Sequence, residues 1–449
     1  MVSWQLWRRR SLLNTQQVDA VGEVEQRQDD FQHVIEDSEV PETQSALLLH
    51  AIRQPYELAA GYPIPKIQDD DELLVKVTVV GLNPIDWKAP DYNFGIPTLP
   101  YISGRELVGI VIQPPTSKAP SRIRKGDLVI IPSTDYRDLR RAAFQQYSIA
   151  SSFNTIRLPT IISQESGSIL GVAFVAAVLA LGICMGVSFE NILDGPDLLK
   201  IVRAIDPERL PVDIREECLS GIKDDERAQK GDFLVIWGGS STCAFIMKQI
   251  ARLAGLKLIS VVDSGKHGLR LSNHDKIRPD LLVDSHDPER AISVIRAATS
   301  NAARFGFDTQ GKESAAQLLR ALASSDTATA LPNDPQEYEA VKSKLPTPPS
   351  TPSEPAKATT TSHLIGLTGV PKTNIPSGVA LHGVPIKLFH EIPEVGEALS
   401  EWCERLLVKG LLVPPDVVGT VEGLEGINEG LDRLRRREIS GGRLVAKLR

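Results

Sequence analysis

The chain has 449 residues, 42% of them hydrophobic, and a formal net charge of −7. This length is typical of two or three domains with a sizeable buried core, and the mild acidity argues against a dedicated nucleic-acid-binding protein. The cysteines are too few and too far apart for a secreted disulfide framework, and no pair has the spacing of metal ligands: they are Cys184, Cys218, Cys243 and Cys403. We therefore expect a protein of a reducing compartment, the cytoplasm, with no metal site.

Residues 1–44 are polar and lack the apolar core of a secretion signal, and we expect a disordered extension there. From residue 46 to about 150, short runs rich in Val, Ile and Leu are bounded by Pro, Gly and Asp, which predicts a β-rich barrel or sandwich. The apolar run from Ile169 to Val187 is long enough to span a membrane, but it is rich in Ala and Gly and has no basic flanks. We predict a buried helix between two domains and no membrane contact.

From Gly231 onward, apolar strands alternate with amphipathic helices, beginning with the strand DFLVIW and the helix TCAFIMKQIARLAG. Alternation of this kind predicts a parallel sheet with helices on both faces. Two stretches interrupt the pattern. Residues 190–230 are charged and predict short surface helices, whereas residues 332–362 are rich in Pro, Ser and Thr and have little to bury.

A candidate phosphate-binding turn lies directly after DFLVIW and opens the helix that follows it. Small residues allow a backbone to approach a pyrophosphate, and a helix N-terminus supplies free N–H groups. Ala244 takes the place of the third glycine of the usual fingerprint, and Ser241 replaces the middle one. The turn consists of Gly238, Gly239, Ser240, Ser241, Thr242 and Cys243.

Asp263 follows the second strand of this alternating region. An acid at that place can accept hydrogen bonds from the ribose hydroxyls of NAD and repel the 2′-phosphate of NADP. Lys266 and His267 lie just beyond and could bind that phosphate, and Asp263 could also be a turn or cap residue. The choice between NAD and NADP therefore stays open.

The segments GLNPIDWK and PYISGRELVG carry charged residues between apolar strands. A buried charge is costly unless it is paired, so Asp86, Lys88 and Glu106 serve either the structure or a ligand. The sequence leaves both alternatives open for each of them.

The segments NPIDWK, SGRELVG, KGDLVII, FQQYSIA and WGGSSTCA, in this order, resemble the zinc-free branch of the medium-chain dehydrogenase/reductase superfamily. They are most similar to fungal quinone-oxidoreductase-like proteins and to the trans-acting enoyl reductases of polyketide synthases. The resemblance covers residues 46–449 and implies an α/β fold. A GroES-like, β-rich catalytic domain at 45–166 and 408–449 would be interrupted by a Rossmann-type, doubly wound parallel-sheet domain at 167–407.

The resemblance also implies a site for NAD(P)H between these domains. The NPIDWK segment would line the nicotinamide side, the glycine-rich turn would hold the pyrophosphate, and the residues after the second strand would hold the adenosine ribose. By position these residues are Pro84, Asp86, Trp87 and Lys88; Gly238, Gly239, Ser240, Ser241, Thr242 and Cys243; Asp263, Ser264, Gly265 and Lys266; and Leu367, Thr368, Ile439 and Ser440, which would close around the cofactor.

The departures from zinc-dependent relatives are informative. No cysteine stands near Asn83–Pro84, Arg105 takes the place of the histidine before Glu106, and no cysteine lies between Ile131 and Phe144. Both zinc sites of those relatives are therefore missing, and we expect no zinc. The trans-acting enoyl reductases also lack an acid at the position of Asp263, which puts a preference for NADPH in doubt.

These observations lead to the hypothesis of hydride transfer from NAD(P)H to an activated alkene or a quinone. The oxygen that becomes negative needs a donor, for which Lys88, Thr242 or a backbone N–H are candidates. A proton must then come from water or a side chain; no acid stands out in the sequence, and Tyr147 is a distant candidate. Two alternatives stay open: a trans-acting partner of a polyketide synthase, and a cofactor-binding protein without turnover. We expect a small-molecule substrate and a monomer or homodimer.

Overall fold

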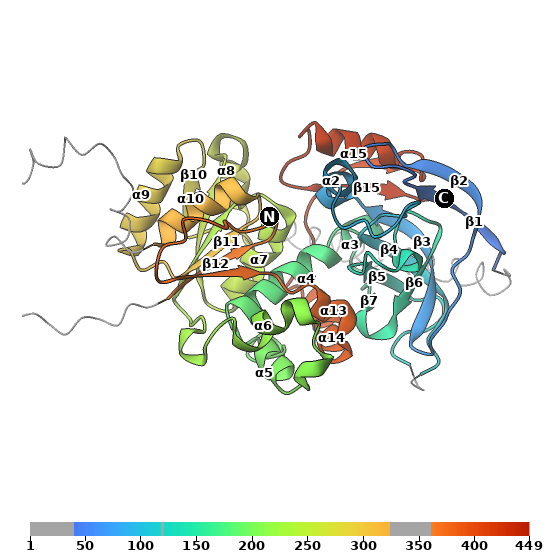
Figure 1. Ribbon diagram of the computed structural model, residues 1–449, viewed down its shortest axis with the longest axis horizontal. Coiled ribbons are helices and arrows are strands. Elements are labelled where there is room, and N and C mark those ends of the chain that lie inside the picture. Colours follow the sequence, from blue (N-terminus) through green and yellow to red (C-terminus); the bar gives the residue numbers. More distant parts are fainter. Residues whose placement is uncertain (1–39, 118–120, 324–360, 449) are drawn as a thin grey trace, which may run out of the picture. The chain divides into compact units, whose positions relative to one another are not determined.

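The computed structural model describes residues 40–117, 121–323 and 361–448 (Figure 1). The chain divides into two compact units. The first unit takes the chain up to Gly171 together with Val417–Glu438 and Leu444–Arg449, and the second takes Val172–Asp416 with Ile439–Arg443. The boundaries predicted at 167 and 408 fall before both divisions, and Ile439 and Ser440 belong to the second unit rather than to the returning segment.

Two sequence-based expectations fall mostly outside the described residues: the N-terminal extension and the Pro/Ser/Thr-rich insertion. Where they overlap the described chain, both end earlier than expected. Thr43 already begins the strand β1, and Ser362 begins the strand β12.

The first unit is built on a seven-stranded sheet with the order β14-β15-β3-β4-β5-β7 and with β6 also paired to β3. The pairings of β3 with β4, β6 and β15, and of β5 with β4 and β7, are antiparallel. A separate antiparallel pair joins β1 and β2. The strands are β1 Thr43–Leu48, β2 Glu57–Pro63, β3 Glu72–Gly81, β4 Glu106–Gln113, β5 Leu128–Pro132, β6 Tyr147–Ser151, β7 Ile156–Arg157, β14 Val417–Glu422 and β15 Arg443–Lys447.

The strand β3 is the centre of this sheet because its sequence, ELLVKVTVVG, is apolar on both faces and most of its residues are buried. The last strand of the chain pairs with it, Val445 opposite Gly81. The helices of this unit are α2 Pro84–Tyr92, α3 Gln164–Gly167 and α15 Ile427–Arg435. The β-rich unit expected from the sequence is thus present.

The second unit contains a six-stranded sheet with the order β10-β9-β8-β11-β12-β13, in which every pair is parallel. Counted along the chain from β8, the order is 3-2-1-4-5-6, which is typical of Rossmann domains. The predicted α/β fold with a doubly wound parallel sheet is therefore confirmed. The strands are β8 Phe233–Trp237, β9 Lys257–Val262, β10 Leu281–Asp284, β11 Phe305–Asp308, β12 Ser362–Gly366 and β13 Val379–Gly383.

Apolar strands and helices form the core of this unit. Val235, Ile259 and Leu364 of the sheet pack in one buried cluster with residues of α9 and α10. The strands read as continuous apolar runs because helices cover the sheet (Figure 1). The helices of this unit are α4 Gly171–Leu179, α5 Leu198–Arg203, α6 Val212–Ser220, α7 Thr242–Leu253, α8 Ser264–Asn273, α9 Pro288–Thr299, α10 Lys312–Leu322, α13 Lys387–Glu391 and α14 Pro393–Val408.

The apolar run near residue 169 forms a continuous helical stretch, Gln164–Cys184, that ends in a π-helical segment, Ala180–Cys184. By length and composition alone it could cross a membrane, but 94% of its most apolar window is buried inside the protein. This is the behaviour of a core helix, as the sequence indicated.

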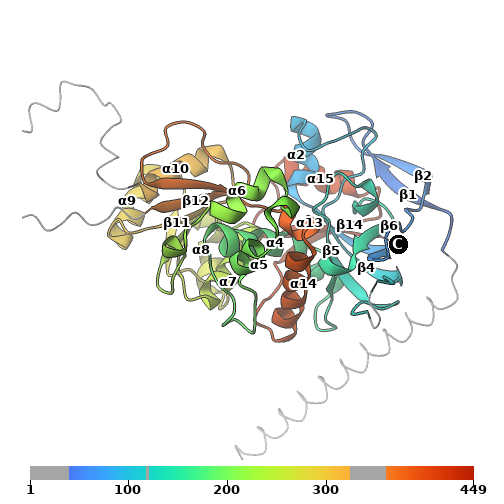
Figure 2. The ribbon, with the colours of Figure 1, turned by 60° about the horizontal axis from the view of Figure 1, so that its bottom comes forward.

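The charged stretch at 190–230 differs from its expectation as a surface element. Leu198, Leu199 and Val202 of α5 are buried, and α14 lies beside α5 and α13 (Figure 2). Apolar residues of the stretch complete the core, so a high local charge did not mean a superficial position.

Candidate functional site

Strands β8 and β11 are neighbours at the point where the strand order of the parallel sheet reverses. In open α/β sheets, ligands bind outside the carboxyl ends of the strands at such a point. The loop after β8 begins with Gly238, and the loop after β11 begins with Thr309, whose hydroxyl donates a hydrogen bond to the Gly238 carbonyl at 2.9 Å. The two loops are thereby joined at the expected ligand-binding edge.

The predicted turn 238–243 has the geometry of a phosphate cradle. Gly238 has a φ of +80°, which side-chain-bearing residues rarely adopt. A Cβ on Gly239 would lie 1.9 Å from the Ser260 hydroxyl oxygen, so only glycine fits there. Ser241 caps α7, its hydroxyl accepting from the Ala244 amide at 3.1 Å. The turn delivers the free amides of a twelve-residue helix to the edge of the sheet.

A cation that the sequence reading missed stands at this helix start. Arg443, 8% exposed, donates from its guanidinium to the hydroxyl of Thr242, the first residue of α7. A positive charge beside a helix N-terminus strengthens an anion site. The sequence gives only one indication of this role: Arg443 lies close along the chain to Ile439 and Ser440, which the resemblance assigns to the cofactor site.

Cys243 has a role different from the one expected. Its thiol is buried and directed at the carbonyl oxygen of Ala173, 3.8 Å away. Burial raises the pKa of the Cys243 thiol to about 12. Its side chain is therefore an inert packing group, and this residue can offer an anion only its backbone.

Lys248, also unnoticed in the sequence, lies beneath the cradle. It is fully buried in α7, and its ammonium donates to the carbonyl of Gly239 at 2.8 Å. Burial, and then the charge of Arg270, lower the pKa of Lys248 to about 7. This side chain holds the turn to the helix from the inner side.

The residues predicted for the adenosine ribose form the start of α8, directly after β9. Asp263 is the cap of this helix, and its carboxylate accepts from the Lys266 amide at 3.0 Å. Its other oxygen lies 3.7 Å from His286, and the side chain remains 40% exposed. Ser264 and Gly265 are the first two residues of the helix. Asp263 is thus both a cap and an exposed acid, which joins the two roles that the sequence left open.

The segment 439–443 meets α8 and α7, as expected for residues that close around one ligand. The hydroxyl of Ser440 lies 2.8 Å from Nε2 of His267. The Leu367 amide donates a hydrogen bond to the Asp308 carbonyl. The Thr368 hydroxyl oxygen lies 3.7 Å from the position that a Cβ on Gly311 would occupy. The structure therefore brings the predicted cofactor residues of the second unit to one edge of its sheet.

In the first unit, α2 carries the residues predicted for the nicotinamide side. Asp86 is fully buried, and its carboxylate accepts from the Asn83 amide at 2.8 Å and from the Ser103 hydroxyl at 3.3 Å. Glu106, also buried, accepts from the Asn83 side chain at 2.9 Å. These two acids hold the start of α2, so their role is structural.

The remaining predicted residues of α2 are more open. Pro84 is exposed at the first position of the helix. The Lys88 ammonium lies 5.8 Å from the centroid of the Trp87 ring, which also contacts the Arg435 guanidinium at 5.6 Å and the Tyr92 ring at 6.1 Å. Lys88 is half-buried. Its approach to a cofactor stays a prediction, and so does a role of Tyr147 as a proton donor.

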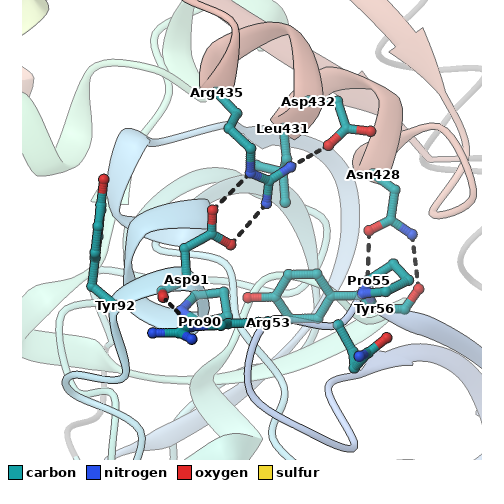
Figure 3. A pocket seen from close by; sticks show the side chains of 11 residues that line it. Arg53, Pro55, Tyr56, Pro90, Asp91, Tyr92, Asn428, Leu431, Asp432 and Arg435 are labelled. Atoms are coloured by element: carbon teal, nitrogen blue, oxygen red, sulfur yellow. Dashed lines mark hydrogen bonds and ion pairs between the residues drawn. The ribbon is translucent and has the colours of Figure 1, made fainter.

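The first unit also has a cavity of about 700 Å³ at the end of α2 that faces α15 (Figure 3). Arg435 spans it and pairs with both oxygens of Asp91 at 2.8 and 3.0 Å. Tyr56 lines it from the other side, fixed through its backbone to Asn428. None of the residues predicted from the resemblance lines this cavity.

Comparison with known proteins agrees with this arrangement. The family described as "Alcohol dehydrogenase GroES-like domain" matches residues 69–182. A trans-enoyl reductase from Aspergillus niger is 26% identical over 90% of this chain and 97% of its own length. A dehydrogenase from Emericella nidulans is also 26% identical, over 84% of this chain and 92% of its own.

Among solved structures, the Escherichia coli quinone oxidoreductase, determined with NADPH, superposes with a TM-score of 0.61 at 14% identity. That superposition covers 90% of this chain and 99% of the other. The GroES-like match, the full-length relatives and the shared two-part fold agree with the motifs of the sequence. Residues 69–182 therefore match the alcohol dehydrogenase GroES-like domain, and over most of its length the chain is similar to trans-enoyl reductases and shares the fold of quinone oxidoreductases.

Proposed function

We propose that this protein is an NAD(P)H-dependent reductase that transfers hydride to an activated carbon–carbon double bond or to a quinone. The observation that carries the proposal is the cradle at the carboxyl end of β8, where Gly239 leaves no room for a side chain and Arg443 adds a cation at the start of α7. The names of the relatives, trans-enoyl reductase and quinone oxidoreductase, support this reaction class.

The described residues fit a dinucleotide. The amides at the start of α7, with Arg443, would hold the pyrophosphate. The exposed carboxylate of Asp263 is suited to ribose hydroxyls and Lys266 to a 2′-phosphate, so the structure supports a nicotinamide dinucleotide without choosing between NAD and NADP. When bound, the nicotinamide supplies the hydride.

The protein's part in the reaction is to stabilise charge and to supply protons. Lys88 is the residue we assign to the substrate oxygen, because its ammonium is half-buried and joined to no carboxylate in the described chain. Thr242 is better suited to positioning, since its hydroxyl is buried and accepts from Arg443. We infer that Thr242 orients the guanidinium at the pyrophosphate site.

We further propose that no metal ion takes part at this site. The place of the zinc-binding histidine in zinc-dependent relatives is taken by Arg105, whose guanidinium donates to the Tyr101 hydroxyl at 3.1 Å and lies over the ring of Tyr136. A guanidinium offers only N–H donors and no acceptor, so it cannot coordinate a cation. A cytoplasmic location and a small-molecule substrate belong to the same proposal.

The test is to mix the full chain with NADH or NADPH and a panel of enones, quinones and enoyl thioesters, and to follow the absorbance of the reduced nicotinamide. We expect oxidation of the cofactor with at least one class of acceptor. Tight cofactor binding without turnover on any acceptor would instead identify a binding protein, and absence of cofactor binding would refute the whole proposal.

A second candidate, favoured by the full-length similarity to trans-enoyl reductases, is a partner of a polyketide synthase that reduces a carrier-bound chain. Turnover of an enoyl group on an acyl carrier protein, compared with the same group on a pantetheine thioester, separates the two. A free-standing reductase should accept both substrates at similar kcat/KM. A trans-acting partner should have a kcat/KM at least about tenfold higher for the carrier-bound substrate, which corresponds to roughly 1.4 kcal/mol of binding free energy from contacts with the carrier.

A further inference from the structure

A second cluster of chemically active side chains lies in the Rossmann-type unit, away from the residues that form the cradle. Cys184 comes from the end of the π-helical segment, Glu217 from α6 and His382 from β13. One ligand atom of each of these three residues lies within 4.8 Å of the others. The cluster therefore joins a thiol, a carboxylate and an imidazole from three distant parts of the chain.

The cluster is ordered by hydrogen bonds. Nδ1 of His382 lies 2.8 Å from a Glu217 carboxylate oxygen, and Nε2 of His382 lies 3.0 Å from Nδ1 of His363 on the neighbouring strand β12. The ring of His363 stacks on Phe305 at 5.3 Å. The thiol of Cys184 faces the Gly383 carbonyl at 3.9 Å. The imidazole of His382 is thus fixed in orientation from both of its nitrogens.

The charge in the cluster is unbalanced. Cys184 and His382 are 0% and 1% exposed, and the Glu217 side chain is 17% exposed. Within the described residues, Glu217 has no ion pair with a lysine or arginine, its one charge-bearing partner being His382. A carboxylate held in such surroundings costs free energy unless a cation compensates it. A divalent cation supplies that charge and has ligands of suitable type ready around it.

We propose that Cys184, Glu217 and His382 form a binding site for Zn²⁺ on residues other than those assigned to the cofactor. Thiolate, imidazole and carboxylate are the three ligand types that zinc takes in proteins, and three protein ligands leave one of its four positions for water. The partial exposure of Glu217 gives that water and the ion a route from solvent.

His363 completes the site without touching the ion. A histidine that ligates through one nitrogen usually donates its other N–H to a fixed acceptor, which sets its tautomer and orientation. With Nδ1 of His382 on the metal side, His363 is that acceptor. His363 is therefore a positioning residue, held by its stacking on Phe305.

The zinc ion would fasten α6, part of the charged stretch 190–230, to the edge strand β13 and to the end of the long apolar helix. The sequence could not show this site, because the spacing rule detects ligands that are close along the chain. Here Cys184, Glu217 and His382 become neighbours only through the fold. The expectation that the chain has no metal site rested on the spacing of the cysteines and on the missing ligands of the two zinc sites found in zinc-dependent relatives.

The experiment begins with the full chain stripped of metal by a chelator and then titrated with Co²⁺ or Zn²⁺ alone. We expect one ion bound per chain, a thiolate-to-cobalt charge-transfer band, and visible absorption of tetrahedral intensity. Zinc at 100 times its dissociation constant should raise the ratio of folded to unfolded protein about 100-fold. Absence of both the charge-transfer band and zinc-dependent stabilisation would overturn the proposal and leave a hydrogen-bonded chain of side chains.

Variants separate the site from adventitious binding. Cys184→Ala should abolish the charge-transfer band, whereas Cys403→Ala, which removes an equally buried thiol outside the cluster, should keep it. Glu217→Gln preserves the shape of the side chain and serves if Cys184→Ala fails to fold. His363→Phe should weaken zinc binding about 10–100-fold and retain the band. A band that survives Cys184→Ala, or that disappears in Cys403→Ala, would also refute the site.

Discussion

The guanidinium of Arg443 donates a hydrogen bond to the hydroxyl of Thr242, the residue that opens α7. Arg443 is the first residue of the last strand, yet it belongs to the Rossmann-type unit, while the rest of that strand belongs to the first unit. The closing segment of the chain thereby supplies a cation to a helix start encoded about two hundred positions earlier. We expect this pair to determine how tightly a pyrophosphate is held.

Replacing Arg443 with methionine should weaken the binding of NADH and NADPH alike. Hydrogen bonds to charged groups contribute about 1.5–3 kcal/mol, which corresponds to roughly a 10–150-fold higher dissociation constant. The measurement is a titration followed by the fluorescence of Trp237, the last residue of β8. Arg435→Met is the control, since that arginine pairs with Asp91 in the first unit. Equal effects of the two substitutions would show that Arg443 has no specific role.

Gly239→Ala should damage the cradle, because its Cβ would lie 1.9 Å from the Ser260 hydroxyl oxygen. Overpacking of this kind costs about 1–3 kcal/mol. Ser260→Ala alone should be nearly neutral, since that hydroxyl is buried without a hydrogen-bond partner in the described structure. The double variant should recover most of the lost cofactor affinity and stability. Urea unfolding and cofactor titration of all three proteins test this, and no recovery in the double variant would contradict it.

Lys248 should make stability depend on pH. Its pKa is about 7 in the folded protein and 10.5 in the reference state, so between these values the unfolded chain binds more protons. The free energy of unfolding therefore rises with pH across this window, by up to about 1.4 kcal/mol per pH unit from this one group. Below pH 7 the Lys248 ammonium is charged in both the folded and the unfolded protein. The full free-energy cost of burying that charge then lowers the stability.

Lys248→Met removes this titration. Urea unfolding at several pH values from 6 to 10 should show the stability of the variant, relative to the native protein, highest at low pH and falling as the pH rises. The loss of the hydrogen bond to Gly239 adds a constant offset and no slope. Parallel pH profiles for the two proteins would contradict a depressed pKa at Lys248.

Asp263→Ser should shift cofactor preference toward NADPH. Serine keeps the cap on α8 that the Asp263 carboxylate now provides, while the negative charge that opposes a 2′-phosphate is removed. The ratio of the two dissociation constants should move at least about fivefold, or roughly 1 kcal/mol for one partly exposed charge. Asp287→Ser, at the cap of α9, is the matched control and should leave the ratio unchanged.

Lys88→Ala should lower kcat about 10²–10³-fold if the ammonium stabilises the developing oxyanion. The dissociation constant of the cofactor should change much less, because that interaction forms only as charge develops. Lys76→Ala is the control, as Lys76 is an exposed residue on β3 of the same unit. Full activity in Lys88→Ala would remove this residue from the site.

The fold followed from local patterns to a large extent. The run DFLVIW and the glycine-rich turn after it predicted β8 and the start of α7, since strand hydrophobicity and turn chemistry are readable over a few residues. The charged stretch 190–230 forms short helices, as its sequence predicted, but Leu198, Leu199 and Val202 of α5 are buried because α5 packs against α6, α14 and the end of the apolar helix. Tertiary packing decided that case.

The parts of the candidate cofactor site that consist of consecutive residues could be predicted from the sequence. The residues that come from distant parts of the chain could not. Arg443 and Lys248 are ordinary cations in the sequence, and only the fold shows that one meets Thr242 and the other the carbonyl of Gly239. Cys243 illustrates the opposite case. It lies within the glycine-rich motif, but its position on α7 directs its thiol at the carbonyl oxygen of Ala173.

The pairing of Val445 with Gly81 has a consequence for biosynthesis. A ribosome has translated the whole Rossmann-type insert before the strand that borders β3 exists, so the sheet of the earlier unit waits, incomplete, on the nascent chain. During that interval the Val79–Gly81 end of one edge of β3 lacks its neighbour and presents free backbone amides and carbonyls, whereas β6 can already pair with the beginning of that edge. Emergence of β15, rather than emergence of the amino-terminal half, is the moment at which this sheet can close.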